Sequence, residues 1–216
     1  MTTAIAQSLA ERYRPTTYAE VCGQDKVIAV LERIKARYGT LAGRAYWISG
    51  QSGTGKTTLA RLIAAEVADS IFTQEVDGTT LGVNDIGQLV ESMRYTAWGR
   101  GGKAVIINEA HGLSKAAIRT LLVAIEPIQS HVVWCFTTTN DGQNTLFENC
   151  DDGGPLLSRC YPLALSRRDL SQAFAKRALE IAEAEGISVT MERCVSLCKQ
   201  HRNNMRAVLM AIEMEG

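Results

Sequence analysis

The sequence predicts an α/β fold in which helices flank a parallel sheet, followed by a small all-helical domain. Up to about residue 163, short apolar runs alternate with segments of helical periodicity, which is the pattern of parallel strands joined by crossover helices. Beyond Leu163 the periodicity is purely helical. We therefore expect a boundary there, with one domain over residues 1–163 and the other over 164–216.

Composition excludes several classes of protein. The chain is 46% hydrophobic and 21% charged, which is ordinary for a folded globular protein and unlike a disordered or fibrous one. Lysine plus arginine equals aspartate plus glutamate at 23 each, so no overall positive charge marks a protein that coats nucleic acid. No stretch reaches the roughly 18 apolar residues of a membrane span, so we expect a cytoplasmic protein with no membrane partner.

Apolar periodicity predicts the elements of the larger domain. Its helices place apolar residues three and four apart, as Val27, Leu31 and Ile34 do, whereas buried parallel strands are short continuous apolar runs. In chain order we predict a helix over 27–38, a strand over 45–49, a helix over 57–69, a strand over 72–76, a helix over 85–95 and a strand over 104–107.

Capping and turn residues delimit the rest of the chain. Ser114 is the expected N-cap of a helix that runs to about Glu126 and is ended by Pro127. After a strand over 132–138, the segment 140–155 is rich in Asn, Asp and Gly, which predicts a surface loop. The remaining helices are expected over 166–184, 191–199 and 204–213.

The segment Gly50–Thr57 matches the pattern G-x-x-x-x-G-K-[ST] and stands between a predicted strand and a predicted helix. Glycines let successive backbone N–H groups point inward, and the helix N-terminus adds partial positive charge, so polyphosphate is the matching ligand. We expect Lys56 to reach the β- and γ-phosphates of ATP and the Thr57 hydroxyl to hold Mg²⁺. The residues predicted to contact nucleotide here are Gly50, Ser52, Gly53, Thr54, Gly55, Lys56, Thr57 and Thr58.

Nucleotide-hydrolysing proteins of this type need an acidic residue at the end of a neighbouring apolar strand. After the strand 104–107, the chain has Asn108 where aspartate is expected, followed by Glu109. An amide can accept a hydrogen bond from metal-bound water but brings no negative charge, so Mg²⁺ affinity and hydrolysis should both suffer. We assign Thr57 and Asn108 to the metal and Glu109 to the general base, and the substitution leaves open natural tuning, a trapped variant or a degenerate site.

These motifs resemble those of AAA+ ATPases of the DNA sliding-clamp loader type, such as the bacterial DNA polymerase III gamma/tau and replication factor C small subunits. The resemblance extends over almost the whole chain and includes the segments Glu11–Pro15, Glu20–Gln24 and Asn108–Ser114. It implies a P-loop NTPase (AAA+) sheet followed by a small helical lid. It also implies that Arg14, Val21 and Gly23 lie near the base and sugar of ATP.

Further roles are implied by the same resemblance. The strand leading to Thr139 and its neighbour Asn140 is similar to the one that carries the first sensor of the γ-phosphate in that family. The tripeptide ending in Cys160 matches a serine-arginine-cysteine motif, so that Arg159 would act in trans on the ATP of a neighbouring subunit. Arg206 resembles the second sensor, carried by the lid. The implied catalytic residues are Glu109, Arg159, Thr139 and Arg206.

Beyond Asn108, the sequence departs from this family in three further ways. Gly87 stands where bacterial relatives often have a basic residue, and the cysteine cluster that binds zinc in the bacterial gamma subunit is absent. Clamp-loader subunits also continue into a helical collar, whereas this sequence stops at Gly216, so either the collar was removed or another mode of assembly replaces it.

The leading hypothesis is an ATPase subunit of a clamp-loader-like oligomer in DNA replication, homo- or hetero-oligomeric, with ATP bound between subunits of a ring or spiral. DNA is an expected partner, gripped by its phosphates through the helix that carries Lys115 and Arg119, and a sliding clamp is a further candidate. A weakly hydrolysing or inactive AAA+ subunit with a regulatory or structural role is the first alternative, which Asn108 favours. A DNA-coating AAA+ filament protein is the second.

Overall fold

The computed structural model describes residues 7–99, 101–139, 142 and 153–215. The chain divides into two compact units, one made of Lys26–Gly50 and Lys56–Leu165 and the other of Met1–Asp25, Gln51–Gly55 and Ser166–Gly216. The domain boundary at residue 163 remains a proposal.

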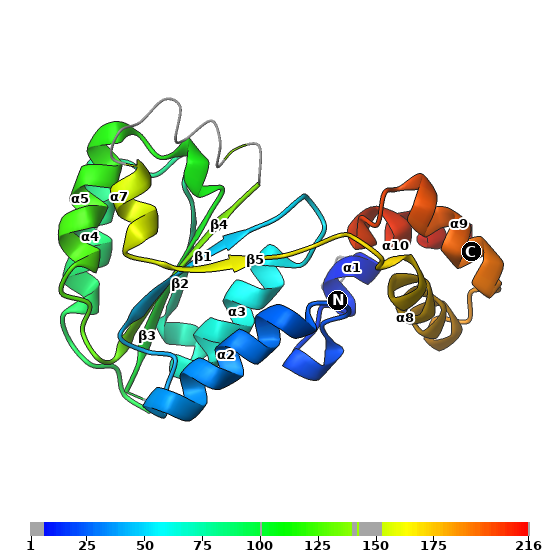
Figure 1. The fold of residues 1–216 in the computed structure, drawn as a ribbon, viewed down its shortest axis with the longest axis horizontal. Coiled ribbons are helices and arrows are strands. Elements are labelled where there is room, and N and C mark those ends of the chain that lie inside the picture. The colour runs from blue at the N-terminus through cyan, green and yellow to red at the C-terminus, as the bar shows by residue number, and fades with distance from the viewer. Residues whose placement is uncertain (1–6, 100, 140–141, 143–152, 216) are drawn as a thin grey trace, which may run out of the picture. The chain divides into compact units, whose positions relative to one another are not determined.

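The larger unit is built on a five-stranded parallel sheet with the order β2-β3-β4-β1-β5. The strands are β1 Arg44–Ser49, β2 Thr73–Asp77, β3 Lys103–Asn108, β4 Val132–Thr138 and β5 Tyr161–Ala164. The helices around them are α2 Asp25–Tyr38, α3 Lys56–Val67, α4 Val83–Met93, α5 Lys115–Ile125 and α7 Gly153–Ser158. Figure 1 shows α4, α5 and α7 on one side of the sheet and α2 and α3 on the other. The predicted α/β fold with a flanked parallel sheet is thus confirmed.

Alternation of side chains along the strands builds the core under α4 and α5. Trp134 and Phe136 of β4 point to this face together with Trp47 of β1, and all three are buried. The Phe136 ring stacks on both indoles, with centroids 5.8 Å from Trp47 and 6.3 Å from Trp134. The opposite face of the same strands packs against α3.

The smaller unit contains the short helix α1 Leu9–Arg12 and the helices α8 Ser171–Ala184, α9 Met191–Gln200 and α10 Met205–Glu213. Its core is formed by Leu9 and by the apolar faces of the three longer helices, including Phe174, Ile181 and Ile212. Among the described residues, no helix is long and apolar enough to cross a membrane.

Several predicted elements are confirmed by the structure, with small shifts at their ends. The strand over 132–138 has the predicted bounds, and the Ser114 hydroxyl accepts the N–H of Ala117 as an N-cap does. The helix that was expected over 57–69 is α3, which already begins at Lys56.

Three expectations are wrong. The structure beyond Leu163 is not purely helical, because β5 continues to Ala164 in parallel pairing with β1. The helix expected from residue 166 begins at Ser171, since the Gln24 amide binds both backbone groups of Ser166, accepting its N–H at 3.2 Å and donating to its carbonyl at 2.8 Å.

The third error is the end of the surface loop expected over 140–155. Residues Gly153 to Pro155 belong to the first turn of α7, where proline is tolerated because its missing N–H would have no partner in the helix. Apart from Gly142, the rest of that expected loop lies outside the described residues.

We predict that Phe136→Ala lowers the free energy of unfolding by about 3–5 kcal/mol, because it leaves a cavity between two indoles. Urea denaturation followed by tryptophan fluorescence measures the change. Val123→Ala is the control, since that side chain is 74% exposed and its loss should change stability by less than about 0.5 kcal/mol. Equal effects of the two substitutions would contradict the assignment of this core.

Candidate nucleotide-binding site

The glycine-rich segment 50–55 joins the end of β1 to the start of α3. Gly53 and Gly55 have φ angles of 75° and 93°, in the left-handed region where a side chain would be strained. The segment ends at the N-terminus of a 12-residue helix, which favours an anionic ligand through the helix dipole and the first backbone N–H groups. Lys56 is the first residue of this helix, and it is only 8% exposed. The other residues predicted to contact nucleotide here are Gly50, Ser52 and Thr54 and, in the first turn of α3, Thr57 and the buried Thr58.

Asn108 is the centre of a hydrogen-bond network at the end of β3. Its side-chain oxygen accepts from the hydroxyl groups of Thr57, at 3.0 Å, and Thr137, at 2.9 Å. Its amide nitrogen donates to Glu75 Oε1 of β2 at 2.8 Å, and Glu75 in turn is bound by Arg61 of α3 at 2.7 Å. The structure therefore brings the two predicted metal ligands, Thr57 and Asn108, into direct contact.

Glu109 follows β3 in a left-handed conformation, with φ of 49° and ψ of 45°. The strand end is tightly packed there: the Gly78 N–H donates to the Asn108 carbonyl at 2.7 Å, and a β-carbon at Gly78 would lie 2.9 Å from the Glu109 carbonyl oxygen. The Glu109 side chain is 42% exposed, and its Oε2 lies 3.5 Å from Nδ1 of His111. An exposed carboxylate beside the network could take a proton from water.

Thr139 lies one residue beyond β4, and its hydroxyl oxygen accepts the N–H of Gly142 at 3.0 Å. Asn140 lies outside the described residues. The threonine that contacts Asn108 is Thr137, which sequence reasoning missed. Alternation along β4 could have indicated it, because Thr137 shares the α3 face with Cys135.

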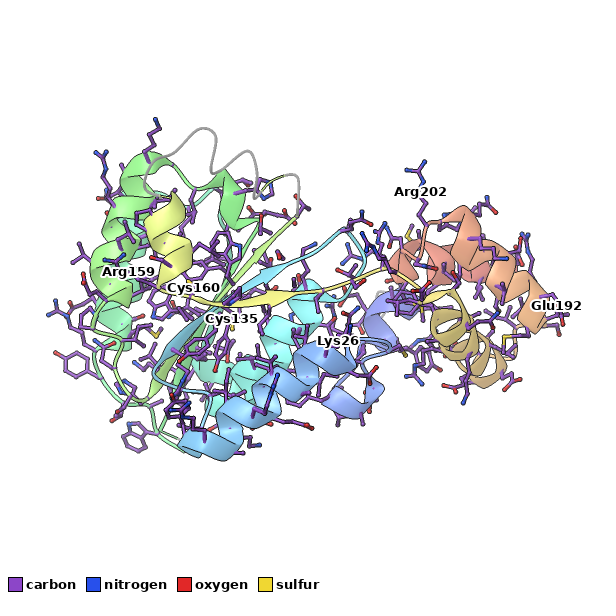
Figure 2. All side chains as sticks on the ribbon, in the orientation of Figure 1. Lys26, Cys135, Arg159, Cys160, Glu192 and Arg202 are labelled. Carbon is purple, nitrogen blue, oxygen red and sulfur yellow. The ribbon has the colours of Figure 1, made fainter. Side chains whose placement is uncertain are left out.

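Arg159 lies just after α7, on the α5 side of the sheet (Figure 2). Its guanidinium donates to the Pro155 carbonyl at 3.1 Å and lies 3.6 Å from a carboxylate oxygen of Glu126. Thr57 and Asn108 meet on the opposite, α3 side. The structure thus does not bring Arg159 to the network of its own chain.

Arg14, Val21 and Gly23 belong to the smaller unit. Arg14 forms an ion pair with Glu11, and Val21 is buried. Gly23 has a φ of 69°, which side chains rarely adopt, and a β-carbon there would overlap the Leu170 side chain, so glycine is favoured.

Arg206 is exposed in the first turn of α10, also in the smaller unit. Asn204 caps this helix, since its side-chain oxygen accepts the Ala207 N–H at 3.3 Å. The same side chain abuts Gly53, where a β-carbon would overlap it. Within the smaller unit, the glycine-rich turn and the start of α10 are therefore in contact.

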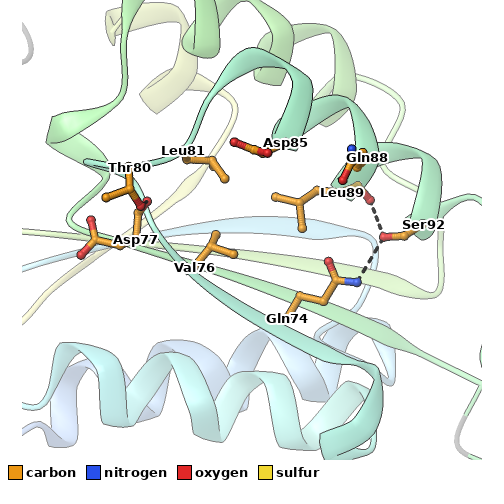
Figure 3. Close-up of a pocket in the computed structure, with 9 residues that line it drawn as sticks. All are labelled: Gln74, Val76, Asp77, Thr80, Leu81, Asp85, Gln88, Leu89 and Ser92. Atoms are coloured by element: carbon orange, nitrogen blue, oxygen red, sulfur yellow. Dashed lines mark hydrogen bonds between the residues drawn. The ribbon is translucent and has the colours of Figure 1, made fainter.

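A separate hollow of about 650 Å³ lies between β2 and α4. Gln74 and Val76 line it from the strand, and Asp77 and Asp85 contribute carboxylates (Figure 3). Both carboxylates serve local turns: Asp85 accepts the N–H of Gly82, and hydrogen bonds from Thr79 hold the pKa of Asp77 below its usual range. The hollow does not include Glu75, whose side chain alternates to the other face of β2.

Comparison with known proteins gives a match over residues 46–151 to the model of the ATPase family associated with various cellular activities (AAA). The DNA polymerase III subunit gamma/tau of Mycoplasma pneumoniae is 26% identical over 95% of this chain and 32% of its own length. The DNA polymerase III subunit tau of Escherichia coli is 29% identical over 77% of this chain and 28% of its own length. The chain thus spans about a third of the length of these relatives.

Solved structures of Thermotoga maritima RuvB have the same fold. One of them, a variant with a single substitution, is 24% identical and superposes with a TM-score of 0.73, covering 93% of this chain and 64% of that one. The structure described as a Holliday junction branch migration motor is 25% identical with a TM-score of 0.71 and the same coverage.

We predict that Gly78→Ala lowers the melting temperature, because its β-carbon would push against the backbone of Asn108 and Glu109. Thermal unfolding followed by circular dichroism measures the change. Gly87→Ala is the control: this helical glycine has nothing within 4 Å of an added β-carbon, so alanine should stabilise α4 by about 0.5–1 kcal/mol. An unchanged melting temperature in Gly78→Ala would show that the strand end is looser than described.

Proposed function

We propose that this chain binds and hydrolyses ATP as one subunit of an oligomer that acts on DNA. The premise is that it carries an AAA ATPase domain and is homologous to DNA polymerase III gamma/tau subunits over about 95% of its length. The observation that carries the proposal is the contact between Thr57, at the head of α3 after the glycine-rich turn, and Asn108 at the end of β3. ATPase activity is supported at the level of the AAA family.

In this proposal the phosphates of ATP lie against the backbone of residues 50–55 and the ammonium group of Lys56. Arg14, Val21 and Gly23 contact the base and sugar. Glu109 accepts a proton from the attacking water, and its exposure at the strand end supports this role.

The donor set at the strand end fits Mg²⁺. Thr57 Oγ1 and Asn108 Oδ1 are oxygen ligands of the kind that Mg²⁺ prefers, and they lie 3.0 Å apart. Both would hold the ion directly or through water. Bound there, Mg²⁺ would neutralise phosphate charge and orient the β- and γ-phosphates.

A second subunit would complete the site. Arg159 is partly exposed and lies on the face of the sheet away from Thr57 and Asn108, which supports action on the ATP of a neighbour. Thr139 and Arg206 would sense the γ-phosphate from β4 and from the helical domain. The assembly would be a ring or spiral of like or unlike AAA+ subunits.

DNA is the proposed macromolecular partner. Lys115 and Arg119 are exposed on α5 and would contact phosphates, which predicts binding that weakens steeply with salt. A sliding clamp is a further candidate partner, as for clamp-loader subunits. The alternative of a weakly hydrolysing, regulatory AAA+ subunit is favoured by Asn108, which adds no charge at the metal position.

We predict that Lys56→Ala weakens ATP binding by about 10–100-fold, because one charge-assisted contact to phosphate is lost. Isothermal titration calorimetry with ATP and Mg²⁺ measures the affinity. Lys35→Ala is the matched control, since that lysine forms an ion pair with Glu66 away from the glycine-rich turn. If the unaltered chain gives no heat, or both variants bind alike, nucleotide binding at this site is refuted.

We predict that Arg159→Ala lowers the steady-state ATPase rate by roughly 10³-fold while ATP affinity stays unchanged, because the arginine acts on a neighbour's nucleotide. The assay is run with and without primer-template DNA, and Arg33→Ala, on the exposed side of α2, serves as the control.

Mixing Arg159→Ala subunits with Lys56→Ala subunits tests the action in trans. An interface with Arg159 on one side and Lys56 on the other regains activity, so the mixture should hydrolyse ATP faster than either variant alone. Activity that is absent from the mixture would speak against a shared site.

A further inference from the structure

The side-chain amide of Asn108 forms hydrogen bonds at both of its ends. Its oxygen accepts from the hydroxyls of Thr57 and Thr137, and its nitrogen donates to Glu75 Oε1 at 2.8 Å. An ionised carboxylate only accepts hydrogen bonds, so it can face only the nitrogen end of an amide. Glu75 therefore determines which end of Asn108 points toward Thr57.

Glu75 is itself held from α3. Arg61 donates to both carboxylate oxygens, through Nε at 2.7 Å and Nη2 at 3.1 Å, and such a bidentate contact fixes the plane of the carboxylate. Thr57 and Arg61 lie one turn apart on the same helix. The hydrogen bonds therefore run from Arg61 of α3 through Glu75 and Asn108 back to Thr57 of the same helix.

We propose that Glu75 is a positioning residue for the magnesium side of the nucleotide site, an inference that rests on the function proposed above. It holds Asn108 with the amide oxygen, rather than the NH₂ group, beside the Thr57 hydroxyl. An oxygen attracts a divalent cation or accepts from its bound water, whereas an NH₂ group repels the cation. Without Glu75 the amide is free to present either end.

The same contact explains why asparagine stands at this position. An aspartate would turn a carboxylate oxygen toward Glu75 at about the 2.8 Å over which the amide now donates, and like charges so close repel each other. An aspartate at position 108 would supply both an oxygen and a negative charge. Here Asn108 of β3 supplies the oxygen and Glu75 of β2 supplies the negative charge. Asn108 is matched to its neighbour and is not simply an acid that has been lost.

Asp77 does not take this role, although it lies opposite Asn108 in the β2–β3 register. Its carboxylate accepts the N–H and the hydroxyl of Thr79, at 2.8 and 2.6 Å, and so belongs to the turn after β2. The carboxylate that reaches Asn108 is that of Glu75, two residues earlier in β2.

The test compares Glu75→Ala with the reciprocal pair Asn108→Asp and Asn108→Asp/Glu75→Gln. In the double variant the glutamine NH₂ donates to the aspartate, so the hydrogen bond is kept with its donor and acceptor exchanged. The readouts are the melting temperature without nucleotide or metal, the affinity for a fluorescent ATP analogue in EDTA, and the Mg²⁺ concentration that gives half-maximal enhancement of its binding. Glu91→Ala is the control, since Glu91 pairs with Arg94 on the exposed side of α4.

We expect Glu75→Ala to raise the half-maximal Mg²⁺ concentration by about 10-fold or more, as loss of a residue that orients a metal ligand typically does, with binding in EDTA unchanged. Asn108→Asp alone should lower the melting temperature by a few degrees. The double variant should regain part of this loss, because the glutamine NH₂ restores the bond to residue 108 but cannot accept from Arg61 Nη2. Glu91→Ala should match the unaltered chain in both nucleotide measurements.

Three results would overturn the proposal. They are an unchanged Mg²⁺ dependence in Glu75→Ala, a loss of binding in EDTA equal to the loss in Mg²⁺, and a double variant no more stable than Asn108→Asp. If the unaltered chain binds no nucleotide, the proposed function fails, whereas the melting temperatures still decide whether Glu75 and Asn108 are matched. If Glu75→Ala does not fold, the melting temperatures of Asn108→Asp and Asn108→Asp/Glu75→Gln still test the proposal.

Discussion

The parallel pairing of β1, β3 and β4 is the constraint on which the candidate site depends. Because the strands run the same way, their carboxyl ends reach one edge of the sheet, where the chain leaves each strand for a helix or turn. The register places Ser49 of β1 opposite Thr138 of β4, and Asp77 of β2 opposite Asn108 of β3. Ser49, Asn108 and Thr137 therefore lie at the same edge of the sheet.

The two faces of the sheet serve different purposes. On the side of α4 and α5, the strands carry Trp47, Trp134 and Phe136, which belong to a buried apolar core. On the side of α3, Thr137 and Glu75 both form hydrogen bonds to Asn108, while Asn108 and Glu75 also bond to side chains of α3. The apolar face of the sheet is packed against α4 and α5 and thus supports the polar face. This support keeps the short side chains of Asn108 and Thr137 close to the N-terminus of α3.

The network also changes how the departure at Asn108 is interpreted. From the chain alone, the residue is an acid replaced by an amide, with weaker metal binding as the consequence. In the structure its two ends have different partners, and the partner of the NH₂ group is a carboxylate paired with Arg61. The charge and the hydrogen-bonding groups at this position therefore depend on Asn108, Glu75 and Arg61 together, which lie on β3, β2 and α3. Their combined effect on metal binding bears on whether the chain hydrolyses ATP or only binds it.

The sequence by itself determined the α/β class, most strands, the cap at Ser114 and the glycine-rich turn before Lys56, because each is written in residues close together in the chain. Only the tertiary structure decided the rest. β5 has a single fully buried residue, Leu163, and becomes a strand through pairing with β1. Glu75 and Thr137 meet Asn108 from positions 33 and 29 residues away, and no local pattern encodes a contact that depends on strand order and register.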